Sequence, residues 1–419
     1  MPLWFRQKVQ NVSREIGLVM AVGESNVDFH NVPGVRLAAT SAGINSASSD
    51  VVLFEFVEGS STAGIFTKSL FAAAPVLLGK EHLEQSAPRY FLVNSGNANA
   101  ATGDLGIADA LNCCKATSQL TGTRPEETIP FSTGVIGERL PVEKITAVIA
   151  DLTENLDESK WLQAAIGIMT TDTRPKIGSR RFDVGGVPVT ITGIAKGAGM
   201  IQPNMATMLS YIATDAKCDA QLLKQLLFDA AETSFNRITV DSDTSTNDSC
   251  MLTATGVSGV DLTTDAARTV FCSELTSLMI ELAQGIIRDG EGATKFVSVI
   301  VEESPSDDVC LEIAYAIANS PLMKTALFAS DANWGRIAMA IGKAKVDIDI
   351  NKLDVYLGDV CLMSGGSKAP DYTEASGAEV MEKEEITITV RLNAGDCRQT
   401  VWTSDLSHEY VRINAEYRT

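Results

Sequence analysis

The chain has 419 residues, of which 45% are hydrophobic and 21% charged, a composition typical of a globular protein with a large apolar core. Its 34 basic and 53 acidic residues give a formal net charge of −19, which argues against a general nucleic-acid-binding or anionic-membrane surface. The sequence also contains no run of eighteen apolar residues, and its length favours two or three domains.

The amino-terminal residues Met1 to Arg6 contain neither a continuous apolar segment nor a cleavage site typical of a signal peptide, so we expect a cytoplasmic protein. The eight cysteines form no Cys-x-x-Cys pair of the kind that binds zinc. We expect them to be reduced and buried, and we predict no metal site.

Helical and strand patterns alternate along the chain without an internal repeat, which predicts a mixed α/β fold. Pro141 is typical of a helix start, and Asp219 of a helix N-cap. In the first part of the chain the patterns predict helices over 141–152, from 219 onward and over about 264–287, and strands over 189–195 and 208–214.

The pattern changes after Lys295, and we place a domain boundary there, giving domains 1–295 and 296–419. Beyond it the patterns predict a helix over 334–344 and strands over 296–301, 346–350, 355–361, 386–392 and 398–403. The charged, glycine-bearing interval 365–385 is expected to be a mobile surface connection.

The stretch KGAGMIQPNMATML, from Lys196 to Leu209, places Thr207 behind a glycine-rich, proline-containing approach, where a loop meets a predicted strand. In a strained loop, the threonine hydroxyl can attack the preceding carbonyl and shift the acyl group from nitrogen to oxygen. Hydrolysis of that ester would cut the bond between Ala206 and Thr207 and free an α-amine, which can act as a general base. Taken alone, the same residues also fit an ordinary turn before a strand.

Other nucleophile and phosphate sites have less support. The three histidines, His30, His82 and His408, lie in no nucleophile elbow or metal-binding spacing, and we expect His82 and His408 to be solvated surface groups. Gly197-Ala198-Gly199 lacks both the P-loop lysine and the full Rossmann glycine spacing, so phosphate binding ranks low.

Several further stretches carry a resemblance that covers essentially the whole chain. They are Asn94-Ser95-Gly96-Asn97-Ala98-Asn99-Ala100, Ser132-Thr133-Gly134-Val135-Ile136-Gly137, Thr170-Thr171-Asp172-Thr173, Arg237-Ile238-Thr239-Val240-Asp241, Thr244-Ser245-Thr246-Asn247-Asp248, Asp289-Gly290-Glu291-Gly292-Ala293-Thr294-Lys295, Asp331-Ala332-Asn333-Trp334-Gly335-Arg336 and Asn414-Ala415-Glu416-Tyr417-Arg418-Thr419. With the Thr207 segment, they resemble the ornithine acetyltransferases, also called glutamate N-acetyltransferases. In that family an Ala-Thr bond is cut autocatalytically and the threonine becomes the nucleophile.

The sequence departs from the family pattern at three positions. The family more often has serine at Ala198, histidine at Gln202 and glycine at Ser242. None of these changes removes a proposed catalytic group, although the glutamine puts in doubt any role for an imidazole near the cut.

The resemblance implies a layered α/β/β/α domain like those of amino-terminal-nucleophile enzymes, followed by a smaller α/β domain. It also implies cleaved chains 1–206 and 207–419, assembled as two α and two β chains. Thr133 and Gly134 would form the oxyanion hole, and six residues would line the substrate pocket. Those six are Thr170, Lys196, Thr207, Glu291, Asn414 and Thr419. A pocket role for the last two requires the final strand to fold back onto the first domain.

The expected reaction moves an acetyl group from N2-acetylornithine to Thr207 and then to glutamate, with no metal or organic cofactor, in arginine biosynthesis. Acetyl-coenzyme A is a possible second donor. Two alternatives stay open at this stage: a self-processing aminopeptidase or amidase of the same fold, which would pass the acyl group to water, and a non-catalytic amino-acid-binding protein.

Overall fold

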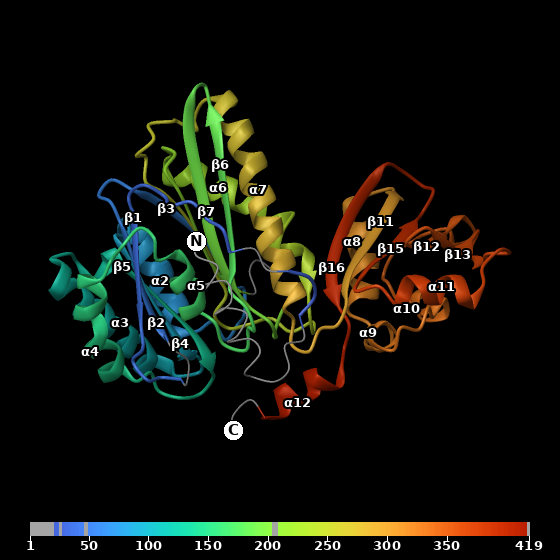
Figure 1. Cartoon of the computed structure of the whole chain (residues 1–419), viewed down its shortest axis with the longest axis horizontal. Coiled ribbons are helices and arrows are strands. Elements are labelled where there is room, and N and C mark those ends of the chain that lie inside the picture. Colours follow the sequence, from blue (N-terminus) through green and yellow to red (C-terminus); the bar gives the residue numbers. More distant parts are fainter. Residues whose placement is uncertain (1–20, 25–26, 46–48, 203–207, 417–419) are drawn as a thin grey trace. The chain divides into compact units, whose positions relative to one another are not determined.

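The computed structural model describes residues 21–24, 27–45, 49–202 and 208–416 (Figure 1). The chain forms two compact units. The large unit comprises Ser25–Asn236 and Thr244–Ile286, and the small unit comprises Met1–Glu24, Arg237–Asp243 and Ile287–Thr419. The large unit contains two β-sheets and the small unit contains a third.

The four-stranded sheet of the large unit has the strand order β1-β2-β4-β5, in which β4 and β5 are parallel and the other pairs antiparallel. The five-stranded sheet has the order β3-β10-β8-β7-β6, in which β10 and β8 are parallel. The strands are β1 (Val35–Thr40), β2 (Val51–Phe56), β3 (Ser61–Phe66), β4 (Tyr90–Asn97), β5 (Thr128–Val135), β6 (Lys176–Val184), β7 (Val187–Lys196), β8 (Leu209–Thr214) and β10 (Ser249–Ala254).

The two sheets pack face to face through aromatic side chains. Tyr211 of β8 lies with its ring centroid 5.0 Å from those of Phe54 on β2 and Phe131 on β5, and Phe91 on β4 lies 5.9 Å away. These side chains are almost fully buried. Because each strand alternates its side chains between two faces, one face of each sheet supplies this shared core.

Helices cover the outer faces. Cys113 of α3 and Ile145, Ile149 and Leu152 of α4 pack on the outer side chains of the four-stranded sheet. On the other sheet, Leu278 and Leu282 of α7 close on Gly178 and Gly193, where a Cβ would lie only 2.6 and 3.3 Å from these leucines. The helices of this unit are α2 (Ala74–Gln85), α3 (Gly103–Thr121), α4 (Val142–Glu154), α5 (Trp161–Gly167), α6 (Ala220–Glu232) and α7 (Asp265–Arg288).

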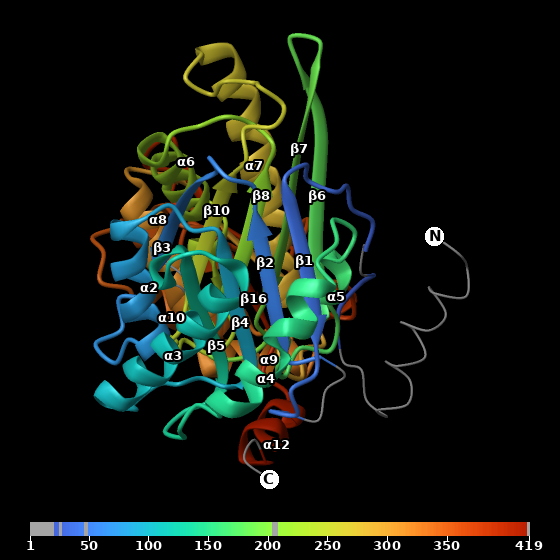
Figure 2. The ribbon, with the colours of Figure 1, turned by 90° about the vertical axis from the view of Figure 1, so that its left-hand side faces the viewer.

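This arrangement confirms the expected α/β/β/α layering, and Figure 2 shows the helices beside the four-stranded sheet. Asp219 caps α6 by accepting hydrogen bonds from the backbone N–H groups of Gln221 and Leu222, as predicted. Helix α7 is long and apolar enough to span a membrane by length and composition alone. Its leucines are buried against the five-stranded sheet, so the apolar composition of α7 is that of a core helix.

The small unit is built on a sheet with the strand order β14-β13-β12-β15-β11-β16-β9. Its core joins β11, β15 and β16 to α8 and α10 through buried aliphatic side chains. The strands are β9 (Ile238–Thr239), β11 (Phe296–Ser304), β12 (Asp354–Leu357), β13 (Val360–Ser364), β14 (Ser367–Lys368), β15 (Glu385–Arg391) and β16 (Cys397–Ser404). The helices are α8 (Asp307–Ala318), α9 (Pro321–Phe328), α10 (Trp334–Gly342), α11 (Glu374–Met381) and α12 (His408–Glu416).

Three predictions for the small unit were wrong. The strand predicted over 346–350 is absent: the alternating apolar side chains Val346 and Ile348 pack on the core without strand pairing, and Ile350 begins a 3-10 helix. The single strand predicted over 355–361 is instead two antiparallel strands, β12 and β13, joined by a turn at Gly358, whose φ is +55°. The chain segment that leads to the carboxyl end is the helix α12 rather than a strand.

The interval 365–385, expected to be a mobile connection, contains β14 and α11. Thr373 caps α11 by accepting a hydrogen bond from the backbone of Ser376, and Met381 is fully buried. Gly377 packs so closely on Tyr372 that a Cβ there would lie 2.8 Å from the tyrosine oxygen. The interval is therefore anchored to the small unit, and the two charged residues of α11, Glu374 and Glu379, are exposed.

His82 was also predicted wrongly. It is 2% exposed, on the inner face of α2, and its Nδ1 lies 2.8 Å from the backbone oxygen of Thr128. His408 is exposed, as expected, with its ring edge-on to Phe328. Five of the eight cysteines are buried and all eight are free thiols.

Candidate functional site

Strand β5 carries the two predicted oxyanion-hole residues at its carboxyl end. Thr133 is buried, and it pairs with Ser95 of the parallel strand β4. Gly134 has a φ of +135°, and a Cβ on it would lie 2.3 Å from the carbonyl carbon of Gly96 and 2.5 Å from the nitrogen of Asn97. Only glycine fits this approach of two strands, which explains why the sequence reads Thr-Gly here.

Lys196 is the last residue of β7, and its side chain reaches the end of β5. Its Nζ donates a hydrogen bond of 3.2 Å to the Oγ1 of Thr133. The two residues come from different sheets of the large unit and are 63 positions apart in the sequence. The fold thus joins a proposed substrate-binding cation to a proposed oxyanion-hole hydroxyl.

Asp172 links Thr170 to the end of β7. Its Oδ2 accepts a 3.0 Å hydrogen bond from the backbone N–H of Thr170, and its Oδ1 accepts one of 2.7 Å from the backbone N–H of Gly197. The same Oδ1 lies 2.5 Å from the Nζ of Lys176. Burial alone would raise the pKa of Asp172, but the positive charges of Lys176 and Lys196 and the hydrogen bonds outweigh it, so the pKa lies well below its usual range.

Asn247 draws three of the quoted motifs together. Its Nδ2 donates hydrogen bonds to the backbone oxygens of Ala98, at 2.6 Å, and Ser132, at 2.8 Å. The side chain of Ser132 in turn donates to the Oδ1 of Asn94, at 2.6 Å. The motifs around positions 94–100, 132–137 and 244–248 are therefore neighbours in space because one buried amide bridges them.

Asp248 is a buried carboxyl group next to this bridge. It directly precedes β10, and Ser249 donates a backbone hydrogen bond of 2.9 Å to the carbonyl of Met208, the residue that follows Thr207 in the sequence. Burial raises the pKa of Asp248 well above its usual value, and a hydrogen bond with Ser245 and the charge of Lys196 lower it only in part. Its Oδ2 accepts no hydrogen bond from any residue that the structure describes.

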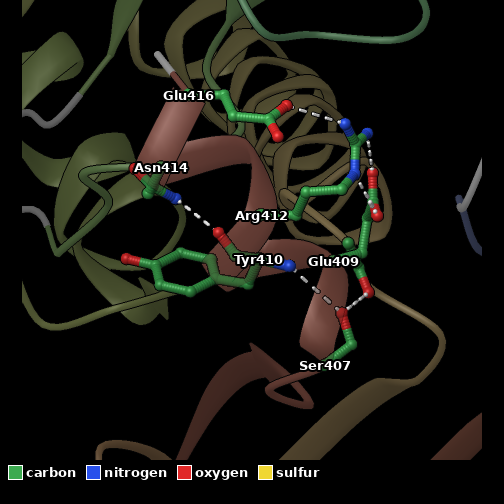
Figure 3. A network of polar contacts seen from close by, with 7 residues as sticks. Ser407, Glu409, Tyr410, Arg412, Asn414 and Glu416 are labelled. Atoms are coloured by element: carbon green, nitrogen blue, oxygen red, sulfur yellow. Dashed lines mark hydrogen bonds and ion pairs between the residues drawn. The ribbon is translucent and has the colours of Figure 1, made fainter.

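The small unit brings Glu291 and Asn414 together. Asn414 of α12 donates from its Nδ2 to the Oε2 of Glu291, at 2.7 Å. The same Nδ2 donates to the backbone oxygen of Tyr410, at 3.0 Å (Figure 3). Glu291 is 8% exposed. The start of α12 is fixed by Ser407, whose Oγ donates to the backbone oxygen of Gly292, at 2.7 Å.

Two backbone conformations explain residue choices nearby. Gly292 has a φ of +68°, and a Cβ there would lie 2.5 Å from the Oγ of Ser407. Ser242 has a φ of +66°, in the left-handed region where glycine is the usual residue. This position is one of those at which the sequence departs from the family pattern, and the backbone shows why glycine suits it.

The structure therefore groups the predicted site residues in two sets. Thr133, Lys196 and Thr170 are joined within the large unit directly or through Asp172, with Gly134 next to Thr133 on β5. Glu291 and Asn414 are joined within the small unit. The remaining predicted residues, Ala206, Thr207 and Thr419, lie outside the described residues.

Asp172 and Asn247 were quoted only as motif members, and no role was assigned to either. Their partners Gly197 and Ala98 are 25 and 149 positions away, so spacing could not identify them. The signal available in the sequence was only that both residues belong to polar motifs, Thr170-Thr171-Asp172-Thr173 and Thr244-Ser245-Thr246-Asn247-Asp248.

Chemically, the large-unit set combines a hydroxyl, a glycine backbone and a lysine ammonium group. Such donors can stabilise an oxyanion and bind a carboxylate. The small-unit set offers a buried carboxylate that can bind a cation. Among the described residues no group of three side chains suits a metal ion.

Comparison with known proteins gives a consistent result. The family model of ArgJ matches residues 36–419. The arginine biosynthesis bifunctional proteins ArgJ of Pseudomonas syringae pv. tomato and of Pseudomonas fluorescens are each 53% identical to the chain over 406 residues, covering 96% of this chain and 100% of theirs. The crystal structure of ArgJ from Bacillus halodurans is 34% identical, with a TM-score of 0.46, and the match covers 48% of this chain and 96% of that one.

Proposed function

The chain belongs to the ArgJ family and is an acetyltransferase of arginine biosynthesis, and we propose that it acts through an acetyl ester on Thr207. In this proposal the chain first cuts itself between Ala206 and Thr207, giving an α chain of residues 1–206 and a β chain of residues 207–419. The single observation that supports the site most strongly is the hydrogen bond between Lys196 and Thr133 beside Gly134.

The first half-reaction removes the acetyl group from N2-acetylornithine. The Thr207 oxygen attacks the acetyl carbonyl carbon, while the free α-amine of Thr207 accepts the hydroxyl proton; a reference pKa of about 8 makes this amine a suitable base. Negative charge develops on the carbonyl oxygen, where the Thr133 hydroxyl and the Gly134 N–H donate. The C–N bond then breaks, and the proton moves to the departing amine of ornithine.

The second half-reaction runs the same chemistry toward glutamate. The amine of glutamate attacks the acetyl-threonine ester, the Thr207 oxygen leaves with a proton, and N-acetylglutamate forms. Lys196 and Thr170 would bind the α-carboxylate that both substrates share, and Glu291, with Asn414 and Thr419, would bind the far ammonium group of ornithine. The pairing of Asn414 with buried Glu291 supports a common binding role for these two residues.

We further propose acetyl-coenzyme A as a second donor, which the word bifunctional in the relatives' names supports. The cleaved chains are proposed to assemble as two α and two β chains in the cytoplasm. Residues 1–295 and 296–419 are proposed as the two folding domains. The assembly rests on the family resemblance, the domains on the change of sequence pattern after Lys295 and the location on the amino-terminal residues. Gel filtration of the purified protein tests the assembly.

The proposed reaction is tested with N2-acetylornithine that carries a labelled acetyl group. Without an acceptor, we expect label on a peptide that begins with Thr207; with glutamate, we expect N-acetylglutamate to form much faster than acetate. Release of acetate at an equal rate with and without glutamate would support the amidase alternative. Label on any other side chain would contradict the proposed nucleophile.

A further inference from the structure

We propose that Asp172 is a positioning residue that holds the substrate-binding residues Thr170 and Lys196 in register with each other. The inference rests on the proposed function, because it assigns to Asp172 the placement of residues that bind the shared α-carboxylate. Asp172 would not touch the substrate itself.

The contacts of Asp172 support this role because they go to two separate segments of the large unit. Its Oδ2 accepts from the backbone N–H of Thr170, in the loop after α5, at 3.0 Å. Its Oδ1 accepts from the backbone N–H of Gly197, the residue directly after Lys196, at 2.7 Å. One rigid carboxylate group therefore fixes the backbone at both proposed substrate contacts.

Charge and burial make the carboxylate form necessary. The Asp172 side chain is fully buried, and the Lys176 side chain is 4% exposed, with 2.5 Å between Oδ1 and Nζ. Lys196 is a second positive charge that acts on the same carboxylate. Because a buried charge needs a partner, the negative charge of Asp172 balances positive charge from Lys176 and Lys196. It does so next to the proposed binding position of the substrate carboxylate.

The geometry also predicts what an isosteric amide would do. Asparagine at position 172 has one oxygen and one NH₂ group, and the NH₂ group cannot accept a hydrogen bond. With the oxygen at the Oδ1 position, Gly197 and Lys176 keep their acceptor, but the Thr170 N–H faces a second donor. The opposite orientation loses the other two contacts, so neither orientation can hold both segments.

Asp215 offers a matched control. It is also buried, at 5% exposed, and its Oδ1 accepts from the backbone N–H of Thr190 at 2.9 Å. Thr190 lies on β7 six residues before Lys196, which is about 20 Å along the strand. Asp215→Asn therefore makes the same exchange at a buried carboxyl group far from the proposed substrate contacts, and its amide oxygen can keep the single contact to Thr190.

The experiment compares steady-state kinetics of the full-length enzyme for the wild type, Asp172→Asn, the double variant Asp172→Asn/Lys176→Met, and Asp215→Asn. The double variant also removes the buried ammonium group of Lys176, whose carboxylate partner Asp172→Asn has taken away, and so separates the ion pair from the hydrogen bonds. Rates are normalised to the cleaved fraction on a denaturing gel, and folding is measured by circular dichroism and Tm.

We expect both Asp172 variants to raise the KM for N2-acetylornithine and for glutamate at least tenfold, with a smaller fall in kcat, and Asp215→Asn to keep both KM values within twofold of the wild type. If the double variant matches Asp215→Asn in its KM values, or if neither Asp172 variant folds, a positioning role is overturned. A wild type that neither cleaves itself nor transfers acetyl would instead refute the proposed function, so the two failures are distinguishable.

Discussion

The ammonium group of Lys196 donates a hydrogen bond to the hydroxyl group of Thr133 across a distance of 3.2 Å. One residue ends β7 in the five-stranded sheet, and the other lies near the end of β5 in the four-stranded sheet. The two sheets therefore meet at the proposed site through a charged donor and a hydroxyl group. The Thr133 end of this contact gives the first test.

Thr133→Val should leave the protein folded and slow acetyl transfer. Valine keeps the shape of threonine but cannot donate to a developing oxyanion, and loss of one such donor costs about 3 kcal/mol, or roughly 10²- to 10³-fold in kcat. Initial rates with N2-acetylornithine and glutamate measure the effect. Thr62→Val is a suitable control, because Thr62 is also buried and hydrogen-bonds to Thr253 on the neighbouring strand. Equal rates for the two variants would remove Thr133 from the oxyanion hole.

Gly134→Ala should destabilise the large unit and abolish transfer. The added Cβ would lie 2.3 Å from the Gly96 carbonyl carbon, so the strands β4 and β5 would have to separate. We expect a loss of about 2 kcal/mol or more in stability, measured by Tm and by denaturant titration.

Two causes can contribute to the loss of stability in Gly134→Ala: the steric clash of the Cβ and the backbone strain at a positive φ. Gly137→Ala separates them. Gly137 has a φ of +86°, but nothing lies within 4 Å of a Cβ placed there. Its variant should therefore show only the backbone penalty of about 1 kcal/mol. A Gly134→Ala protein as stable as Gly137→Ala would contradict the close approach described above.

Asp248 gives a pH-dependent prediction. Burial raises its pKa well above the unfolded value of about 3.9, so the folded state holds a proton that the unfolded state releases. Its contribution to stability is present below about pH 4 and is lost as the pH rises toward the folded pKa. Asp248→Asn stays neutral at every pH. The Tm of the variant minus the Tm of the wild type should therefore increase as the pH rises from pH 4 to pH 8. A Tm difference that is constant across this range would show that Asp248 is charged in the folded protein.

Asn414→Ala should weaken substrate binding in the small unit. It removes the 2.7 Å hydrogen bond to Glu291, and we expect a rise of about tenfold in the KM for N2-acetylornithine. Arg412→Ala, on the same helix, is the control: the Arg412 side chain is 55% exposed, so its ion pairs with Glu409 and Glu416 contribute little to stability.

Deletion of residues 414–419 should abolish transfer without changing the circular dichroism spectrum, and retained activity in the deletion would exclude a role for the carboxyl end.

Much of the fold follows from hydrophobic periodicity in the sequence. The strands β7, β11, β15 and β16 and the helices α4, α6, α7 and α10 lie where the patterns predict them, because a long apolar stripe specifies which face is buried. The failures have a physical reason as well. Val346 and Ile348 alternate like strand residues but only pack on a core. The burial of His82 was not predicted because the charged residues of α2 hid its inner face, so the helix itself was not predicted.

The site was predictable only as a list of residues. The pairing of Lys196 with Thr133 and the bridge made by Asp172 join positions 63 and 25 residues apart, and such contacts are set by sheet topology rather than by spacing. Motif resemblance named Thr133, Thr170 and Lys196, whereas the carboxylate that connects two of them became visible only in the folded chain.

The central claim is that the chain cuts itself before Thr207, and the intact mass of active, purified protein tests it most directly. We predict two fragments in place of the 44.6 kDa chain, with a new amino-terminal sequence Thr-Met-Leu; Thr207→Ala should stay whole and inactive, and Thr207→Ser should be partly cut. A fully active preparation that contains only the uncut 44.6 kDa chain would contradict the account.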